Sequence, residues 1–417
     1  MAKQSSVTRF RLKKALETLA SKEGRGTELI SLYVTPGRQI SDVMNYLRQE
    51  YCTASNIKSS STRKHVQEAI VKVMQRLKLF KEPPQNGLII FCGAIPHGAP
   101  GTEEMETYVI IPPEPINIYL YRCDDKFYIE PLEEMMREKE TYGIMVVDGS
   151  GATYAILRGS RLEIVREISS GLPGKHRAGG QSARRFERLR EVEVNEYLKR
   201  AGEYANKIFF GLPDFKGLII GGPGSTKLDF ENGDYLNYML KQKVLAKVDT
   251  AYIGEQGVKE VVEKAPEILR HVRYVEEKNL VQQFLYELGH DTGLATYGEH
   301  EVREALNKGV VKTLLLSEAL DVTRVFVKCS NCAYTEEKSM KFFEIPRFEQ
   351  ELVNRPCPQC STPTLTISET RALVEELADL GDHMGVDSEI ISAETEEGAQ
   401  LLQSFGGIAA ILRFKQP

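Results

Sequence analysis

The residues that most clearly point to chemistry lie in a glycine-rich run at residues 171–190, GLPGKHRAGGQSARRFERLR. The adjacent glycines Gly179 and Gly180 let a backbone approach another surface closely, because no Cβ stands in the way. Gln181 follows them, and its amide or its backbone N–H can position a water or stabilise an oxyanion. A glutamine cannot act as a general base. The pattern therefore favours a reaction assisted by orientation rather than by proton transfer.

The same run carries an excess of positive charge. Its basic side chains face one acidic residue, Glu187, in a chain whose formal net charge is −5. Such a local excess in an acidic protein predicts contact with a phosphate backbone. From these residues alone, a loop that assists a reaction and a loop that only binds RNA are both open. The basic residues are Lys175, Arg177, Arg184, Arg185, Arg188 and Arg190.

Two CxxC pairs offer a second kind of chemistry. The pairs are Cys329-x-x-Cys332 and Cys357-x-x-Cys360, with 24 residues between them. Four thiolates at this spacing are typical of a tetrahedral zinc-ribbon site, and they leave no open position for a catalytic metal. The spacing predicts one structural Zn²⁺ in an insert at about residues 325–365, with reduced free thiols as the alternative.

A second glycine run, GGPGSTK at residues 221–227, follows the apolar segment GLIIGG. It lacks the G-x-x-x-x-G-K-[ST] order of a phosphate-binding loop. We interpret it as a turn after a strand, and we expect no nucleotide or organic cofactor.

A polar loop at residues 53–65, TASNIKSSSTRKH, holds one apolar residue, Ile57, among small polar ones. Apolar residues at helical spacing predict a helix on each side, capped near Ser41 and near Ser61. Because both apolar faces must pack against a core, the loop is expected to be held rigidly at the end of a helical hairpin. The expected faces are Val43, Tyr46, Leu47 and Tyr51 in the first helix, and Val66, Ala69, Ile70, Val73 and Leu77 in the second.

Length and composition limit the class of protein. The 417 residues predict two or three domains, and a hydrophobic content of 41% is enough for their cores. The net charge excludes a generally basic nucleic-acid coat, so RNA contacts must use local patches. The N-terminal residues lack the apolar core of a signal peptide, and no apolar run approaches the length of a membrane span. The CxxC pairs suit a reducing compartment, so we expect a soluble cytoplasmic protein.

The predicted fold class is α/β (α+β), in a three-domain protein with mixed sheets and flanking helices and a small zinc-ribbon-like insert in the third domain. The expected domains are residues 1–138, 139–273 and 274–417. A strand meander, GIMVVD, ATYAILR and RLEIVREI, opens the second domain, and a long helix starts near residue 182. Expected elements elsewhere include a strand at Ile116–Arg122 and a helix at Thr370–Leu380.

Three motifs together resemble the class 1 peptide chain release factors of the eukaryotic and archaeal type. NIKS at residues 56–59 and GGQ at residues 179–181 are similar to that family's paired motifs, and YRCDDKF at residues 121–127 looks like its Tyr-x-Cys-x-x-x-Phe. The resemblance covers essentially the whole chain in the family's domain order. The compact sequence, without a eukaryotic-style acidic extension, suggests an archaeal member.

The resemblance implies that the first domain reads a stop codon of messenger RNA in the ribosomal A site. Lys58 would contact the first uridine or its phosphate, and Ile57 would pack the loop. Glu28 replaces the serine of the family's Gly-Thr-Ser motif, and Tyr119 stands where eukaryotic members usually have serine. The residues implied in stop-codon recognition are Asn56, Ile57, Lys58, Ser59, Glu50, Thr27, Tyr121, Cys123, Lys126 and Phe127.

By the same resemblance, the GGQ loop reaches the peptidyl transferase centre, where Gln181 would help a water attack the peptidyl-tRNA ester. The protein would not be a free-standing enzyme, because the ribosome supplies most of that site. The implied catalytic residues are Gly179, Gly180 and Gln181, and the implied contacts to ribosomal RNA are Lys175, Arg177, Arg184 and Arg185.

The third domain would bind a translational GTPase and then an ATP-driven ribosome recycling factor. Its acidic residues between Glu369 and Glu397 form a solvated surface that would suit a basic partner. No membrane partner is expected. Two other functions stay open: a ribosome-rescue factor of the related no-stop family, which lacks Gly-Gly-Gln, and a plain module that binds ribosomal RNA without a hydrolytic role.

Overall fold

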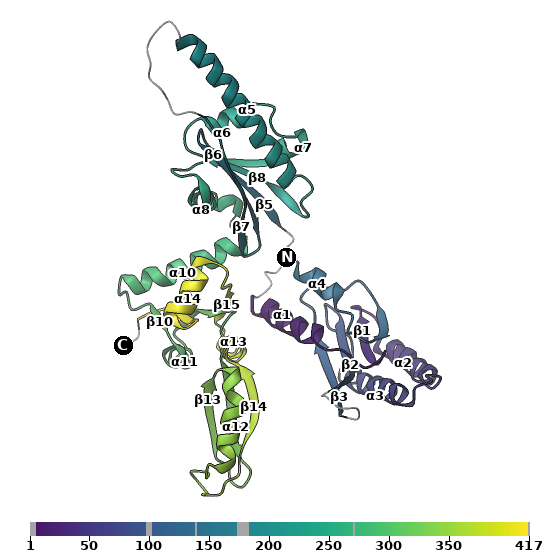
Figure 1. Cartoon of the computed structure of the whole chain (residues 1–417). Helices are drawn as coiled ribbons and strands as arrows, with labels where there is room; N and C mark the ends of the chain where they lie inside the picture. Colours follow the sequence, from purple (N-terminus) through teal and green to yellow (C-terminus); the bar gives the residue numbers. More distant parts are fainter. Residues whose placement is uncertain (1–5, 97–101, 138–139, 173–182, 270–271, 416–417) are drawn as a thin grey trace. The chain divides into compact units, whose positions relative to one another are not determined.

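The chain forms two compact units, residues 1–137 and 138–417, which Figure 1 shows in the colours of the sequence. No helix in the described part of the chain is long and apolar enough to cross a membrane. The computed structural model describes residues 6–96, 102–137, 140–172, 183–269 and 272–415.

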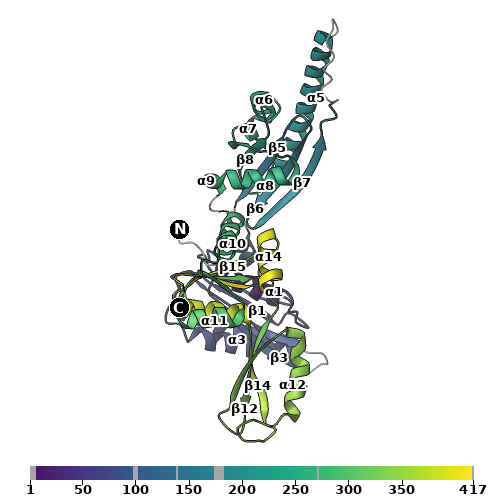
Figure 2. The same ribbon diagram turned by 90° about the vertical axis from the view of Figure 1, so that its left-hand side faces the viewer.

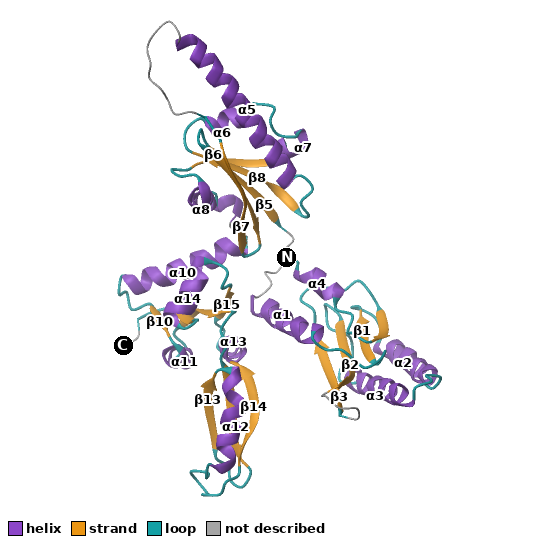
Figure 3. Cartoon of the chain, in the orientation of Figure 1, coloured by secondary structure: helices purple, strands orange, loops and turns teal. Residues whose placement is uncertain are grey.

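The first unit is a four-stranded antiparallel sheet with helices on both faces (Figure 3). Its elements in chain order are α1 (Ser6–Ala20), β1 (Leu29–Val34), α2 (Ile40–Ala54), α3 (Ser60–Leu77), β2 (Leu88–Pro96), β3 (Glu103–Ile110), β4 (Leu120–Asp124) and α4 (Glu130–Met136). The strand order is β3-β2-β1-β4. Helices α2 and α3 pack on one face, and α1 and α4 pack on the other. Strand β1 is therefore wholly buried.

The expected helical hairpin is confirmed, with two local differences. All five residues of the apolar face expected for α3 are buried. Helix α2 begins at Ile40, with Gln39 as an N-cap whose side chain makes no cap bond. Asp42 therefore lies in the first turn, where the helix dipole favours a carboxylate. Near the end of α2 only the small Ala54 is buried, and Tyr51, expected on the same face, is exposed.

The second unit opens with a five-stranded sheet in the order β7-β6-β5-β8-β9. The predicted meander of β5, β6 and β7 is confirmed, and β8 and β9 continue the sheet in parallel. Helices α5, α6 and α7 cover one face, and α8 and α9 cover the other. The elements are β5 (Thr141–Val147), β6 (Gly151–Arg158), β7 (Arg161–Ser169), α5 (Ala183–Phe209), β8 (Phe215–Gly222), α6 (Thr226–Asn232), α7 (Tyr238–Lys241), β9 (Val244–Asp249), α8 (Gly254–Lys264) and α9 (Pro266–Leu269).

A second sheet in this unit has the order β10-β16-β11-β15. Figure 2 shows its strand β15 beside α10 and α14. Leu315 of β11 faces α10 and α14, whereas its neighbour Leu314 faces α13 on the other side. The elements are α10 (Arg273–Gly289), β10 (Ala295–Tyr297), α11 (Glu299–Asn307), β11 (Val311–Ser317), α13 (Leu373–His383), β15 (Asp387–Ile391), α14 (Glu396–Phe405) and β16 (Ile408–Leu412).

An insert between β11 and α13 folds as a three-stranded antiparallel sheet in the order β13-β12-β14. Its small core contains Val325, Val327, Phe348 and Leu352 together with the cysteines. The predicted fold class is therefore confirmed, with three domains, mixed sheets, flanking helices and a cysteine-containing insert. The insert comprises β12 (Thr323–Cys329), β13 (Thr335–Met340), η1 (Phe342–Glu344), α12 (Ile345–Asn354) and β14 (Leu365–Ala372).

Two predicted boundaries are wrong. Strand β4 begins at Leu120 rather than Ile116, because the backbone N–H of Ile116 donates to the carbonyl of Asn86 at 3.1 Å instead of joining the ladder with β1. Helix α13 begins at Leu373 rather than Thr370. Thr370 instead pairs with Val325 in the ladder between β14 and β12.

Candidate functional site

The loop between α2 and α3 presents three polar side chains around one apolar anchor. Asn56, Lys58 and Ser59 are exposed, whereas Ile57 is half-buried and packs against the core of α2 and α3. The apolar residue attaches the 56–59 loop to the core, and the polar residues remain accessible to a ligand. The packing expected of Ile57 is confirmed.

Side chains in the first turns of α3 hold the 56–59 loop. Ser59 is the N-cap, and its Oγ accepts a hydrogen bond of 3.3 Å from the backbone N–H three residues later. Arg63 donates from Nη1 to the carbonyl of Ile57 at 3.3 Å. Gln67 donates from Nε2 to the Oγ of Ser55 at 3.1 Å. Because the buried face anchors α3, these bonds preorganise the loop.

Predicted residues from two elements meet in an aromatic cluster between α2 and β4. Tyr46 of α2 packs edge-on against Tyr121 and Tyr119, with ring centroids 5.8 and 6.1 Å away. Tyr46 also forms a hydrogen bond with Glu50, one turn further along α2. The Sγ of Cys123 donates to the Oη of Tyr121 at 3.2 Å. We call these five half-buried residues the tyrosine cluster.

Burial favours the protonated form of the phenols and of the thiol in the tyrosine cluster. Burial raises the pKa of Tyr121, and the neighbouring Cys123 adds to this effect. Burial and the hydrogen bond to Glu50 raise the pKa of Tyr46. Burial also raises the pKa of the Cys123 thiol. Neutral phenols can donate hydrogen bonds, and unpaired RNA bases present acceptors on their edges.

Sequence reasoning missed two residues at this site, Arg38 and Tyr46. The guanidinium carbon of Arg38 lies 3.5 Å from the ring centroid of Tyr119, a cation–π contact. Within the described residues, the Nε of Arg38 and the hydroxyl of Tyr119 are buried without a hydrogen-bond partner. Such groups suit a bound polar ligand. Helical spacing does not distinguish a core residue from a residue that lines a pocket, such as Tyr46. No local sequence pattern marks Arg38 as a site residue.

The turn between α1 and β1 brings Thr27 to the segment that follows β4. Thr27 is exposed, and so is Lys126. The backbone N–H of Gly24 donates to the carbonyl of Asp125 at 2.8 Å, which joins the two segments. Two predicted residues from distant parts of the sequence therefore belong to one edge of the first unit.

Phe127 lies apart from the tyrosine cluster. It is only 6% exposed, and its ring packs edge-on against Phe91 with centroids 5.4 Å apart. Its core lies on the α1 and α4 face of the sheet, whereas Tyr121 and Cys123 pack on the α2 and α3 face. Phe127 therefore supports the sheet from the opposite side.

In the second unit, helix α5 begins where the glycine-rich loop ends. Arg184 and Arg185 lie in its first turn, and Arg185 and Arg188 are exposed. The other residues predicted for hydrolysis and for RNA contact lie outside the described residues: Lys175, Arg177, Gly179, Gly180 and Gln181.

The glycine run at residues 221–227 is a turn between β8 and α6, as predicted. Lys227 is only 4% exposed, and its Nζ donates to the carbonyls of Gly222 and Gly224 at 2.8 and 2.7 Å. The same Nζ lies 2.5 Å from a carboxylate oxygen of Asp249. The lysine charge is therefore satisfied within the protein and does not face a phosphate.

The four cysteines of the CxxC pairs converge in the insert. Their Sγ atoms all lie within 4.8 Å of one another. Cys329 and Cys360 are separated by 3.6 Å between their sulfurs, and so are Cys332 and Cys357. A tetrahedral ion with metal–sulfur bonds of about 2.3 Å needs sulfurs about 3.8 Å apart. The four residues therefore fit a metal ion.

Two threonine hydroxyls favour the thiolate form of two of these cysteines, Cys329 and Cys360. The Oγ1 of Thr362 lies 3.0 Å from the Sγ of Cys360, and that of Thr364 lies 3.2 Å from the Sγ of Cys329. Hydrogen bonds from Thr362 lower the pKa of Cys360 to about 6. The hydroxyl of Thr364 likewise lowers the pKa of Cys329. Thiolates are the form that binds metals.

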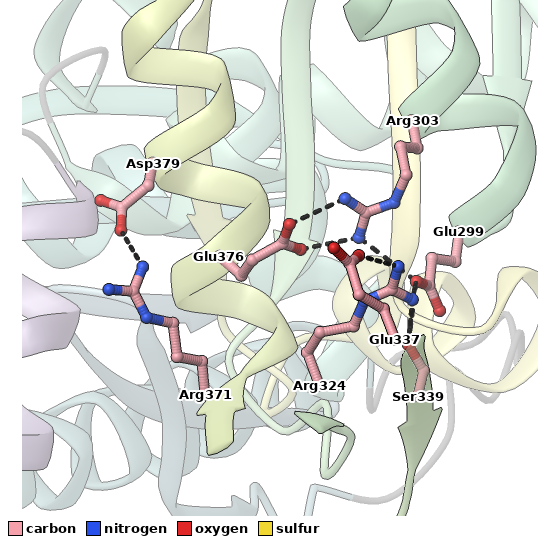
Figure 4. A network of polar contacts seen from close by, with 8 residues as sticks. All are labelled: Glu299, Arg303, Arg324, Glu337, Ser339, Arg371, Glu376 and Asp379. Carbon is pink, nitrogen blue, oxygen red and sulfur yellow. Dashed lines mark hydrogen bonds and ion pairs between the residues drawn. The ribbon is translucent and has the colours of Figure 1, made fainter. Parts of the chain in front are cut away.

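Part of the expected acidic surface is neutralised within the protein. Glu376 of α13 accepts two hydrogen bonds from Arg303 of α11, both 2.7 Å long, as Figure 4 shows. Asp379 pairs with Arg371 at 3.7 Å. The network continues to β12 and β13, and so it joins the insert to helices α11 and α13. The expectation of a solvated acidic surface is therefore wrong for Glu376, whereas the side chain of Asp379 is still 42% exposed.

The chain is similar to known proteins over nearly its whole length. Three family models match in succession: eRF1 domain 1 at residues 7–137, eRF1 domain 2 at residues 141–271 and eRF1 domain 3 at residues 274–416. Peptide chain release factor subunit 1 of Methanobrevibacter smithii is 49% identical over 414 residues, which cover 99% of each chain. The protein of the same name from Pyrococcus abyssi is 50% identical, over 97% of this chain and 98% of that one.

A solved structure described as the crystal structure of archaeal translation termination factor aRF1 is also similar. Its TM-score is 0.52 at 32% identity, over 97% of this chain and 98% of that chain. Three domains in this order define a translation termination factor of the release-factor class. The chain belongs to the eRF1 family. The predicted family is therefore confirmed, and a ribosome-rescue function is not favoured, because the matched models are those of eRF1.

The N-cap of α3 yields a stability prediction. Ser59→Ala removes the acceptor for an orphan backbone N–H, so it should lower the free energy of unfolding by about 1 kcal/mol. Ser59→Asp keeps an acceptor and should retain most of the stability. Urea unfolding followed by circular dichroism measures both variants. Equal losses in the two would contradict the capping role.

Proposed function

We propose that this chain terminates protein synthesis by recognising a stop codon in the ribosomal A site and inducing hydrolysis of the peptidyl-tRNA ester. The observation that carries the proposal is an exposed, internally braced 56–59 loop in a chain of the eRF1 family. The protein acts with ribosomal RNA, messenger RNA and peptidyl-tRNA and is not a free-standing enzyme. Its place of action is the cytoplasm, where ribosomes translate.

The 56–59 loop is proposed to read the first base of the stop codon. The exposed ammonium of Lys58 contacts the first uridine or its phosphate. Asn56 and Ser59 supply further hydrogen bonds at the loop. Because α3 already orders the backbone, little conformational entropy is lost when RNA binds.

The tyrosine cluster is proposed to receive the following bases. Aromatic faces and neutral phenols suit unpaired bases, which are recognised by stacking and by hydrogen bonds on their edges. Glu50, Tyr121 and Cys123 line this surface, and the exposed Thr27 and Lys126 are proposed as further contacts.

The glycine-rich loop of the second unit is proposed to act at the peptidyl transferase centre. Gly179 and Gly180 let the backbone approach the transfer RNA end, and Gln181 positions the attacking water. The basic residues proposed to neutralise ribosomal RNA are Lys175, Arg177, Arg184 and Arg185. Exposed Arg185 and Arg188 at the start of α5 support this role.

The domain at residues 274–417 is proposed to bind a translational GTPase and then an ATP-driven recycling factor. Its acidic residues other than Glu376 and Asp379, which pair with Arg303 and Arg371, would face a basic partner surface. Residues 1–138 and 139–273 are proposed to be the codon-reading and hydrolysis domains.

The four-cysteine cluster is proposed to hold one structural Zn²⁺ per chain. Four thiolates complete a tetrahedral shell, so the ion would have no open position for substrate. Its role would be to stabilise an insert whose apolar core is small.

A lysine variant tests the decoding proposal. Lys58→Ala removes a contact to a base or phosphate, worth roughly 1–3 kcal/mol, so release at stop codons should fall about tenfold to hundredfold at subsaturating factor. Lys78→Ala, at the exposed far end of α3, is the matched control. Tyr121→Phe, which keeps the ring and removes the hydroxyl, should also weaken release. Wild-type release by both Lys58→Ala and Tyr121→Phe would overturn the assignment.

Glycine variants separate binding from hydrolysis. Gly179→Ala and Gly180→Ala should abolish release, because each adds a Cβ where backbone must approach RNA. Gln181→Ala should reduce release less, because alanine keeps the backbone N–H. All three should still bind ribosomes paused at a stop codon. Gly149→Ala, at a turn glycine with open space around it, is the control.

The outcomes of the glycine series are distinct. A Gly179 variant with full release activity would remove the loop from the reaction. Loss of ribosome binding in these variants would instead favour a loop that only anchors the protein to RNA.

Elemental analysis tests the metal proposal. Protein purified without chelators should contain about one zinc per chain, and Cys360→Ser should lose it and unfold the insert at lower temperature. Cys52→Ser changes an exposed cysteine outside the insert and should keep the zinc. Substoichiometric zinc in the wild type would contradict a structural ion.

A further inference from the structure

A buried carboxylate joins two loops of the first unit. Glu28, at the start of β1, is only 2% exposed. One of its oxygens accepts a hydrogen bond of 3.1 Å from the backbone N–H of Arg25. The other lies 2.8 Å from the Nδ1 of His65 in α3. A carboxylate accepts hydrogen bonds only, so the Nδ1 of His65 is the donor.

The hydrogen bond between Glu28 and His65 is needed to offset the free-energy cost of burying the Glu28 carboxylate. A buried carboxylate is costly unless hydrogen bonds or a charge replace its lost hydration. The backbone of Arg25 belongs to the same turn as Glu28, so it stabilises the turn alone. His65 is the partner that comes from another element. Its bond therefore determines where the turn lies relative to α3.

The two loops joined by this pair are those proposed to face the codon. Thr27, which is exposed, directly precedes Glu28. His65 lies in the first turns of α3, two residues after Arg63, which holds the carbonyl of Ile57. The two loops also approach each other closely, since a methyl group at Gly26 would lie 3.6 Å from the Oγ1 of Thr62.

On its other side the turn is attached independently of α3. The backbone N–H of Gly24 donates to the carbonyl of Asp125 at 2.8 Å. Arg25 pairs with Glu103 of β3 at 3.3 Å. These contacts keep the turn folded without His65. Loss of the pair therefore shifts Thr27 relative to the 56–59 loop and leaves the sheet in place.

We infer that Glu28 and His65 are positioning residues for codon recognition, which set the separation between Thr27 and the 56–59 loop so that both contact one stop codon. This inference rests on the proposed function. Neither side chain touches the codon. The pair determines how well the first unit discriminates a stop codon from a sense codon that differs by one base, and it does not take part in hydrolysis.

Substitutions of His65 test the inference, because they differ in whether an N–H donor remains at the position of the His65 Nδ1. His65→Asn places an amide N–H where the Nδ1 of the imidazole lies and keeps the bond to Glu28. His65→Gln offers an N–H at the more distant position, and His65→Ala offers none. Lys64→Ala changes the exposed neighbour on the same helix and serves as the control.

The full-length variants are assayed for peptide release on ribosomes programmed with each stop codon and with one-base-different sense codons. His65→Ala and His65→Gln should raise the factor concentration for half-maximal release about tenfold and lower the ratio of stop-codon to sense-codon release. The maximal rate at saturating factor should not change. His65→Asn and Lys64→Ala should behave like the wild type.

Several results would overturn the inference. Wild-type discrimination in His65→Ala would show that the pair does not position the loops. An effect of His65→Asn equal to that of His65→Ala, in proteins with the wild-type melting temperature, would do the same. A lower maximal rate with unchanged half-maximal concentration would place His65 in another step. Failure of the wild type to release peptide at any stop codon would instead refute the proposed function.

Discussion

The first turns of α3 bind two separate loops at once, and the arrangement of the first unit depends on this constraint. Ser59 caps the helix, and Arg63 holds the carbonyl of Ile57. His65 then binds Glu28, which lies in a different turn of the chain. Polar groups of both loops thus form hydrogen bonds with side chains of α3, and the other face of this helix is buried in the core. The exposed residues between these bonds, Lys58 among them, are held without contacts of their own to the core.

The sheet extends this arrangement to a third segment. Strand β1 is central and pairs with β4, so the residues of β4 alternate between two helical layers. Tyr121 and Cys123 face α2 and join Tyr46, whereas Phe127, just beyond the strand, enters the opposite core. One face of the unit therefore carries the residues suited to RNA, and the other face supplies its rigidity. The glycine-rich loop belongs to the other unit, so the residues proposed for recognition and those proposed for hydrolysis are separated along the chain.

Local patterns predicted the features that depend on neighbours in sequence. The apolar stripe from Val66 to Leu77 is buried, and the meander of β5, β6 and β7 has the expected bounds within a few residues. The CxxC spacing predicted the convergence of four sulfurs. The motifs predicted the family because three of them occur in one order.

Features that depend on partners distant in sequence could not be predicted. Arg38, which follows β1, contacts Tyr119, which precedes β4, and no periodicity marks either residue as part of a pocket. In the sequence, nothing distinguishes Glu376 from the acidic residues near it, but in the structure it is paired with Arg303, which lies on another helix. The position of Tyr46 fits a core residue and a pocket residue equally well. Helical spacing shows which face of the helix a side chain lies on, but it does not show whether that face meets a core or a pocket. Only the tertiary arrangement distinguishes these cases.

The central claim is that this chain couples codon recognition to ester hydrolysis on the ribosome. The most direct measurement is the release of labelled peptide by the wild-type protein from ribosomes that display a stop codon, a sense codon or no messenger RNA, with free peptidyl-tRNA as a further substrate. The account predicts release at stop codons and none above background from the other three. Equal release at sense codons, or hydrolysis of free peptidyl-tRNA, would contradict it.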